Sequence, residues 1–313
     1  MPTWDSILKE AETYQPLALF DKYVKELKES TGRTVICYMS AFSLPKPEAP
    51  PAFFSIVDQD IQGFMTCSKG VKKEGLDLII HSPGGDYEAT KRIINYLHEI
   101  YKHIRVFVPH MAMSGGTLIA CAADEIYMGP YSSLGPTDPQ VFIKNRYVPI
   151  GAVIQEFNRA FQEVSKDPKK VILWRERLKD VPIGLINSLE TMRDNSARYL
   201  KELLQKRNCR DKDEGIIEEI VETLNSYDRH SSHGRGISLQ NAQELKLNVK
   251  DLRKEPELED KVLSVYHAGI ILFQTTPVYK IIANHLGRHF LMLPPIVPPQ
   301  KTQIPSPPSS PRQ

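Results

Sequence analysis

Residues 76–117 read LDLIIHSPGGDYEATKRIINYLHEIYKHIRVFVPHMAMSGGT, and this stretch decides the fold class. Two short runs within it, Leu76–His81 and Ile104–Val108, are apolar, rich in branched residues and bounded by turn formers, which predicts buried strands. Between them, Asp86–Tyr101 carries apolar residues at helical spacing. A helix of this length between two strands is the usual crossover between parallel strands. We therefore predict an α/β fold, with helices covering a mainly parallel sheet.

The flanking sequence extends this domain on both sides. Upstream, Thr34–Met39 (TVICYM) predicts another buried strand, and downstream apolar stripes at helical spacing begin at Ala152. Pro294–Gln313 carries eight of the 24 prolines of the chain, so it is expected to be a flexible tail. The predicted organisation has three parts. An N-terminal helical segment covers 1–33, an α/β domain covers 34–290 with a helical insertion at about 152–228, and a disordered Pro-rich tail covers 291–313.

Composition excludes several classes of function. The chain has 313 residues with 40 Lys and Arg against 38 Asp and Glu, and this balance does not predict a nucleic-acid partner. No apolar run approaches the roughly 18 to 20 residues of a membrane span, and the N-terminus lacks the pattern of a signal peptide. The four cysteines are widely spaced, so we expect reduced thiols and no metal site. We expect a cytoplasmic protein without a cofactor.

Two glycine-containing loops follow the predicted strands. Ser82-Pro83-Gly84-Gly85-Asp86 follows the first strand, and by itself it is compatible with a simple turn. Met113-Ser114-Gly115-Gly116 follows the second strand and places a serine between a strand end and a helix start. The glycines there allow a sharp turn, and free amides at the helix start favour an oxyanion. The alternative is that Ser114 only caps the helix.

Together, the two loops resemble the Clp protease/crotonase superfamily, in which such glycines supply an oxyanion hole and the elbow serine is the nucleophile. The resemblance extends to Ala122–Met128 as a strand, Ser133–Gln140 as a loop and Gly236–Val249 as a late helix. The segments LGPTDPQ (134–140) and KIIANHLG (280–287) narrow it to the serine dehydrogenase proteinase family, a Clp-related branch.

The resemblance implies the remaining catalytic residues. Ser114, Asp138 and His233 reproduce the order Ser, Asp, His of the branch, with His233 as base and Asp138 as its orienting partner. The amides of Gly85 and Gly115 would receive the oxyanion. Relatives are peptidases that bind extended peptides and form rings, so the resemblance implies a serine endopeptidase with peptide or protein substrates and a homo-oligomeric ring. A separate ATPase is a possible partner, because the chain contains no phosphate-binding Gly-x-x-x-x-Gly-Lys motif.

Several alternatives remain open from the sequence. Lys144 could replace the histidine in a Ser-Lys dyad, as in related signal-peptide peptidases, and His230 competes with His233. His285 could be a core histidine or a site residue. The same oxyanion amides could serve a crotonase-like acyl-CoA hydrolase or isomerase. The fold could also persist as a catalytically silent scaffold.

Overall fold

A mainly parallel sheet forms the centre of the protein. The computed structural model describes residues 4–46, 50–143, 146–179, 181–225 and 236–294. Seven strands lie in the order β11-β10-β1-β2-β3-β5-β9, and the five from β1 to β9 are parallel, whereas β10 and β11 are antiparallel additions at one edge. The strands are β1 Thr34–Ser40, β2 Gly75–His81, β3 His103–Val108, β5 Glu125–Met128, β9 Val249–Asp251, β10 Lys280–Asn284 and β11 His289–Met292. The predicted α/β fold with a mainly parallel sheet is therefore confirmed, and β11 extends to Met292, beyond the expected start of the tail at 291.

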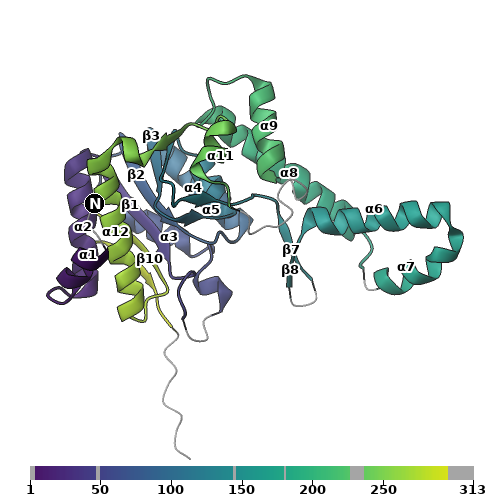
Figure 1. Cartoon of the computed structure of the whole chain (residues 1–313), viewed down its shortest axis with the longest axis horizontal. Coiled ribbons are helices and arrows are strands. Elements are labelled where there is room, and N and C mark those ends of the chain that lie inside the picture. The colour runs from purple at the N-terminus through teal and green to yellow at the C-terminus, as the bar shows by residue number, and fades with distance from the viewer. Residues whose placement is uncertain (1–3, 47–49, 144–145, 180, 226–235, 295–313) are drawn as a thin grey trace, which may run out of the picture.

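Helices cover both faces of this sheet (Figure 1). On one face lie α1 Trp4–Ala11, α2 Pro16–Thr31 and α12 Pro256–Thr275, and on the other lie α3 Asp60–Ser68, α4 Tyr87–Ile100 and α5 Gly115–Cys121. Successive strand residues point to opposite faces, so Ile79 packs with the α2 and α12 side while Leu78 and Ile80 pack with the α4 side. Two apolar cores result, and they fix the ends of β2 and β3 relative to each other.

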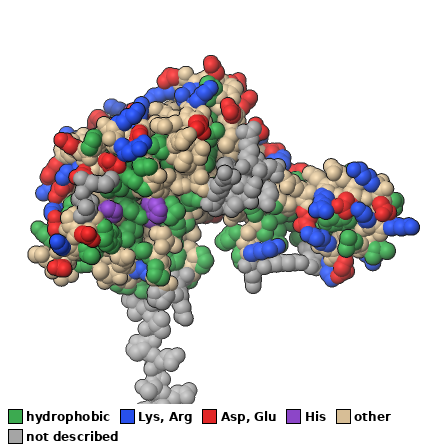
Figure 2. Space-filling view, viewed as in Figure 1, with side chains coloured by type: hydrophobic (Ala, Val, Ile, Leu, Met, Phe, Trp, Pro, Cys, Tyr) green, Lys and Arg blue, Asp and Glu red, His purple; other side chains and the backbone are tan. Residues whose placement is uncertain are grey.

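An arm of helices projects from the body (Figure 1). The hairpin of β7 Gln140–Ile143 and β8 Arg146–Pro149 leads into it. The arm begins with α6 Ile150–Lys166, η2 Pro168–Lys170 and α7 Val171–Leu178, and the chain returns through α8 Leu185–Lys206 and α9 Glu214–Asn225. Figure 2 shows charged side chains of both signs mixed with hydrophobic ones on the arm. Helices therefore occupy the region where the sequence pattern turned helical at Ala152.

Short elements complete the chain. They are η1 Pro51–Phe53, β4 Met111–Ala112, β6 Ser133–Leu134, α11 Leu239–Glu244 and η3 Leu252–Lys254. All four cysteines are buried, and none forms a disulfide in the structure. Within the described ranges, no helix combines the length and apolar character needed to cross a lipid bilayer.

Candidate active site

The loops that follow β2 and β3 are hydrogen-bonded to each other at the carboxyl ends of the strands. Ser82 N donates to Met111 O at 3.0 Å, and Met113 N donates to Ser82 O at 2.9 Å. The segment β4 (Met111–Ala112) also pairs in parallel with β6 (Ser133–Leu134). Three loops thus form a second small layer above the sheet, at the edge where active sites of parallel sheets gather.

Ser114 occupies an unusual backbone conformation in this layer. Its φ is 51° and its ψ is −114°, a region that residues with a side chain rarely adopt and that costs about 1–3 kcal/mol. Although Ser114 stands at the start of α5, its side chain makes no capping hydrogen bond. The alternative role as a simple helix cap therefore lacks the interaction that defines it.

Gly84 explains how the two glycine loops approach so closely. A Cβ atom at Gly84 would lie 2.6 Å from the Ser114 Cβ and 2.6 Å from Met113 O. The φ of Gly84, 89°, also favours glycine. The loop after β2 is therefore more than a turn, because it lies directly against the Ser114 elbow.

The backbone of Gly85 is held from one side by Ile56. Ile56 N donates to Gly84 O at 2.7 Å, and Asp86 N donates to Ile56 O at 2.8 Å. Backbone groups alternate between the two edges of an extended segment, so the N–H and C=O of Gly85 face away from Ile56. Sequence reasoning missed Ile56, because nothing in its local pattern marks a partner 29 residues later in the chain.

Gly115 supplies the second free amide. It is the first residue of α5, where an N–H has no partner within the helix. In the described part of the chain, neither Gly85 N nor Gly115 N donates a hydrogen bond to another group. Both glycines line the same cleft as Ser114. Two N–H groups without partners in one cleft are the kind of donors that can stabilise an oxyanion.

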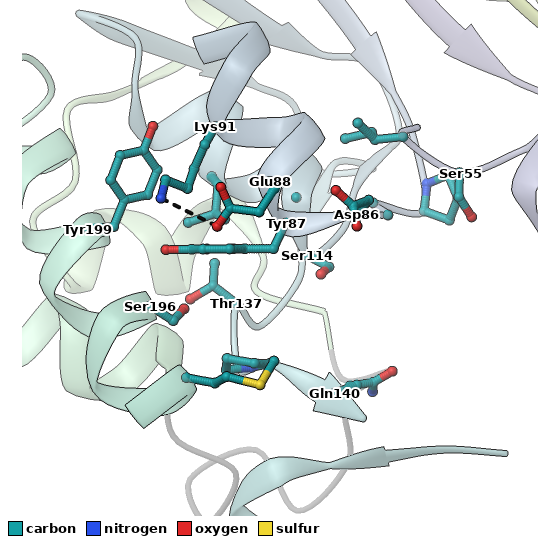
Figure 3. Close-up of a pocket in the computed structure, with 18 of the residues that line it drawn as sticks. Ser55, Asp86, Tyr87, Glu88, Lys91, Ser114, Thr137, Gln140, Ser196 and Tyr199 are labelled. Atoms are coloured by element: carbon teal, nitrogen blue, oxygen red, sulfur yellow. Dashed lines mark hydrogen bonds and ion pairs between the residues drawn. The ribbon is translucent and has the colours of Figure 1, made fainter. Parts of the chain in front are cut away.

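The cleft has a volume of about 980 Å³ and lies between the body and α8 (Figure 3). Ser55 and Asp86 lie to one side of Ser114, and Thr137, Ser196 and Gln140 lie to the other (Figure 3). Its size is at the upper end of the usual range for ligand pockets. The cleft is therefore large enough for a sizeable ligand.

One wall of the cleft is aromatic and charged. The Lys91 Nζ lies 5.3 Å from the ring centroids of both Tyr87 and Tyr199 and 3.4 Å from Glu88 Oε1 (Figure 3). Burial raises the pKa of Tyr87 to about 12, so this phenol stays protonated at neutral pH. Helices α4 and α8 supply this wall, which the helical spacing of their apolar residues did not predict.

Asp138 lies on the loop that adjoins the elbow. Its side chain is buried, with 4% exposed. The preceding residue, Thr137, donates from its N–H to Leu224 O at 2.7 Å. Leu134 and Ile237 exchange two backbone hydrogen bonds of 3.0 and 2.7 Å. The segments on both sides of 226–235 therefore contact the loop of Asp138.

None of the candidate bases is among the described residues. His233 and its competitor His230 fall within 226–235, and Lys144 falls within 144–145, so the structure places none of them. It places Ser114, Gly85 and Gly115 on one cleft and Asp138 on the adjoining loop.

His285 lies far from this site in the fold. Its Nδ1 is 3.3 Å from both N and O of Val35, near the beginning of β1. The loops of Ser114 lie at the opposite, carboxyl ends of the parallel strands. His285 is therefore not among the residues that line the Ser114 cleft.

A pair of histidines lies on the α12 side of the sheet. The rings of His81 and His110 stack at 5.5 Å, and Tyr266 Oη is 3.0 Å from His110 Nδ1. Burial lowers the pKa of His81 to about 3, and it also lowers the pKa of His110. Among the described residues, no group of three or more His, Cys, Asp and Glu side chains is placed to hold a metal ion.

Known proteins resemble this chain at several levels. Two uncharacterized proteins of Methanocaldococcus jannaschii, MJ0137 and MJ1495, are 38% and 42% identical to it over 121 and 145 residues. These matches cover 38% and 46% of this chain, and they span less than half of either relative, 42% and 48%.

Three solved structures are similar at low sequence identity. Two are mutants of the 1510-N membrane-bound stomatin-specific protease, one of them in complex with a substrate peptide. Their identities are 15% and 14%, their TM-scores 0.40 and 0.39, and the matches cover 65% and 76% of this chain and 79% and 83% of theirs. The third is a mutant of ClpP1 from Listeria monocytogenes, with 15% identity, a TM-score of 0.34, and coverage of 64% of this chain and 89% of that one.

A family model gives the decisive comparison. The model of the ClpP-like SDH-type serine proteinases matches residues 53–268, which is more than half of the chain. The matched range contains the loops of Gly85, Ser114 and Asp138. The chain therefore belongs to the ClpP-like SDH-type serine proteinase family.

Proposed function

We propose that the protein is a serine endopeptidase that cleaves peptide bonds through an acyl-enzyme on Ser114. The observation that carries this proposal is the strained Ser114 elbow, which shares a cleft with the unengaged amides of Gly85 and Gly115. Backbone strain at a single non-glycine residue is typical of a nucleophile held in a fixed orientation. Family membership supports the same chemistry.

The reaction follows from these positions. Ser114 Oγ attacks the carbonyl carbon of the scissile bond while the base removes its proton, and the carbonyl oxygen becomes an oxyanion between Gly85 N and Gly115 N. The base then returns the proton to the leaving amine, and an ester links Ser114 to the acyl part of the substrate. A water molecule attacks this ester while the base takes its proton, and the base then gives that proton to Ser114 Oγ as the bond between the acyl carbon and Oγ breaks and the second product leaves.

We assign the base to His233 and its orientation to Asp138. The contacts of Leu134 with Ile237 and of Thr137 with Leu224 support this assignment, because they bring the flanks of 226–235 to the loop of Asp138. Asp138 would fix the imidazole tautomer and stabilise its protonated form. A dyad of Ser114 with Lys144 is the alternative within the same reaction.

The substrate is proposed to bind as an extended strand. Ile56 pairs with one edge of the 84–86 segment, so on the other edge the C=O of Gly85 is left to accept from the main chain of a bound peptide, while the Gly85 N–H is kept for the oxyanion. Main-chain pairing of this kind gives affinity with little dependence on sequence. From the family resemblance, we also propose that the protein assembles as a homo-oligomeric ring. Any ATP-driven unfolding of substrates would come from a separate ATPase, because the chain contains no phosphate-binding Gly-x-x-x-x-Gly-Lys motif.

Labelling with a fluorophosphonate tests the proposed nucleophile. Wild-type protein should give one adduct, which peptide mass mapping places on Ser114 and which Ser114→Ala eliminates. Loss of the adduct in His233→Ala, with retention in Lys144→Ala, would support the histidine as base, and the opposite pattern would support the dyad. Folded wild-type protein that never forms an adduct would contradict the peptidase proposal and favour a silent scaffold.

A further inference from the structure

Lys280 opens β10 and is almost completely buried, with only 1% of its surface exposed. Its Nζ lies 2.7 and 2.8 Å from the two carboxylate oxygens of Asp60, which is fully buried at the start of α3. A buried ion pair adds little net stability, because the cost of desolvating both charges offsets their attraction. Net stability therefore does not explain why two charged side chains are buried here, and we look for the explanation in the groups that the pair positions.

The pair binds the backbone of a segment that lines the cleft. Lys280 Nζ donates to Ser55 O at 2.8 Å, and Val57 N donates to Asp60 Oδ2 at 3.0 Å. The Tyr38 hydroxyl donates to the same carboxylate oxygen at 2.8 Å and so fixes it to β1. Both residues that flank Ile56 are therefore tied to one buried ion pair.

Ile56 transmits this restraint to the proposed oxyanion hole. Its N–H and C=O bind Gly84 O and Asp86 N, on either side of Gly85. A Cβ atom at Gly115 would lie 3.2 Å from the Ile56 Cδ1, so the side chain of Ile56 also packs beside the second donor. One residue thus contacts the segments of both oxyanion amides.

We propose that Lys280 and Asp60 form a positioning pair that holds Ile56 and, through it, directs the Gly85 amide toward the developing oxyanion. This inference rests on the proposed function, and it adds residues that never touch the substrate. Oxyanion donors act because they are oriented before the reaction, and a displacement of about 1 Å can cost on the order of 100-fold in rate. A buried charge pair fixes direction and distance better than apolar contacts, which explains its place beneath this segment.

Lys280→Met removes the ammonium and keeps a long side chain. A matched control is Arg105→Met, because Arg105 pairs with the fully buried Asp77 at 2.7 Å near the amino ends of the strands, away from the cleft. With a peptide ester as substrate, kcat of Lys280→Met should fall about 10-fold to 100-fold with little change in KM, because the interaction with Gly85 N forms in the transition state. Arg105→Met should lose stability but keep kcat.

Hydrogen exchange tests the same proposal independently of activity. The amide of Asp86 donates to Ile56 O, so peptides that contain Asp86 should exchange faster in Lys280→Met than in wild type or in Arg105→Met. Unchanged exchange at Asp86, together with a kcat equal to that of the control, would overturn the proposal. If wild-type protein neither hydrolyses the ester nor labels at Ser114, the proposed function fails, and exchange still decides whether the pair positions the Gly85 segment.

A double variant covers the case in which Lys280→Met does not fold because Asp60 is left as an unpaired buried charge. Lys280→Met combined with Asp60→Asn leaves no buried charge and still lacks the bond to Ser55 O. The same selective loss of kcat and the same faster exchange at Asp86 are expected. Wild-type kcat in this folded double variant would overturn the proposal.

Discussion

Gly85 lies against Ile56 so closely that a Cβ atom on Gly85 would sit 2.3 Å from both the N and the O of Ile56. The contacts are with backbone, which cannot rotate away as a side chain can. Gly85 therefore cannot gain a methyl group unless the segment that pairs with it moves. Gly85 belongs to a glycine-rich loop that can be seen in the sequence, whereas no sequence pattern predicts Ile56 as its partner.

Gly85→Ala tests this link. The displaced segment should misdirect the Gly85 amide and lower kcat about 100-fold to 1,000-fold, the usual cost of losing one oxyanion donor. Steady-state kinetics on a peptide ester would measure it. Gly215→Ala on α9 is the control, since no atom lies within 4 Å of a Cβ there, and it should keep kcat and gain up to about 1 kcal/mol of stability. Wild-type kcat in Gly85→Ala would contradict the assigned oxyanion role.

A comparison of two replacements of Ser114 separates the energetic cost of its backbone conformation from the loss of the nucleophile. Both Ser114→Ala and Ser114→Gly should lose fluorophosphonate labelling, but only glycine adopts φ 51° and ψ −114° without strain. Ser114→Gly should therefore be more stable than Ser114→Ala, by about 1 kcal/mol after allowing for the greater chain entropy of glycine. Chemical denaturation measures the difference, and equal stabilities would show that the elbow is not strained.

Gly115→Ala should lower both stability and kcat because of a local steric clash. A second substitution should relieve that clash. A Cβ atom on Gly115 would lie 2.6 Å from Thr90 Oγ1 on α4, whereas no unusual φ demands glycine there. Thr90→Ala should therefore restore part of the stability and part of kcat in the double variant. Additive losses in this double-mutant cycle would show that the contact between α4 and α5 is not the cause.

The histidines near α12 predict a loss of stability in acid. Burial lowers the pKa of His81 to about 3 and also lowers the pKa of His110 and His267, whereas an unfolded histidine has a pKa of about 6.5. Below pH 6.5 the unfolded chain binds more protons than the folded one, so stability falls as the pH drops from about 6.5 toward 3.

His81→Phe isolates the largest of these contributions. His81 alone should cost roughly 3 kcal/mol between pH 6.5 and pH 4, so the free energy of unfolding of the variant should depend less on pH by about that amount. Phenylalanine is suitable because Phe42, His110 and Tyr266 surround the ring. Parallel pH profiles for wild type and variant would contradict the assignment.

The central fold was predictable because its signals are local. The runs at β2 and β3 and the helical spacing of α4 lie within one continuous stretch, and the structure forms all three. Helix α12 and strand β10 were not predicted as elements. Helix α12 is buried over much of its circumference, so its apolar residues show little periodicity, and β10 begins with a buried lysine where a strand pattern predicts an apolar residue.

The site was only partly predictable for a related reason. The glycines and Ser114 follow strand ends directly, so their approach follows from topology. Ile56, Asp60 and Lys280 reach the site through long-range contacts, and Lys280 is 220 residues from Asp60 along the chain. No local pattern records a pairing at that distance, and only the folded structure brings those groups together.

Trapping the acyl-enzyme tests the central claim most directly. Wild-type protein is mixed with a peptide nitrophenyl ester, quenched within the first turnover and digested for mass mapping. The account predicts a burst of nitrophenol and a peptide that contains Ser114 with the mass of the acyl group, neither of which appears in Ser114→Ala. Ester hydrolysis by wild type without acylation of Ser114 would contradict it, because the chemistry would then proceed without the proposed nucleophile.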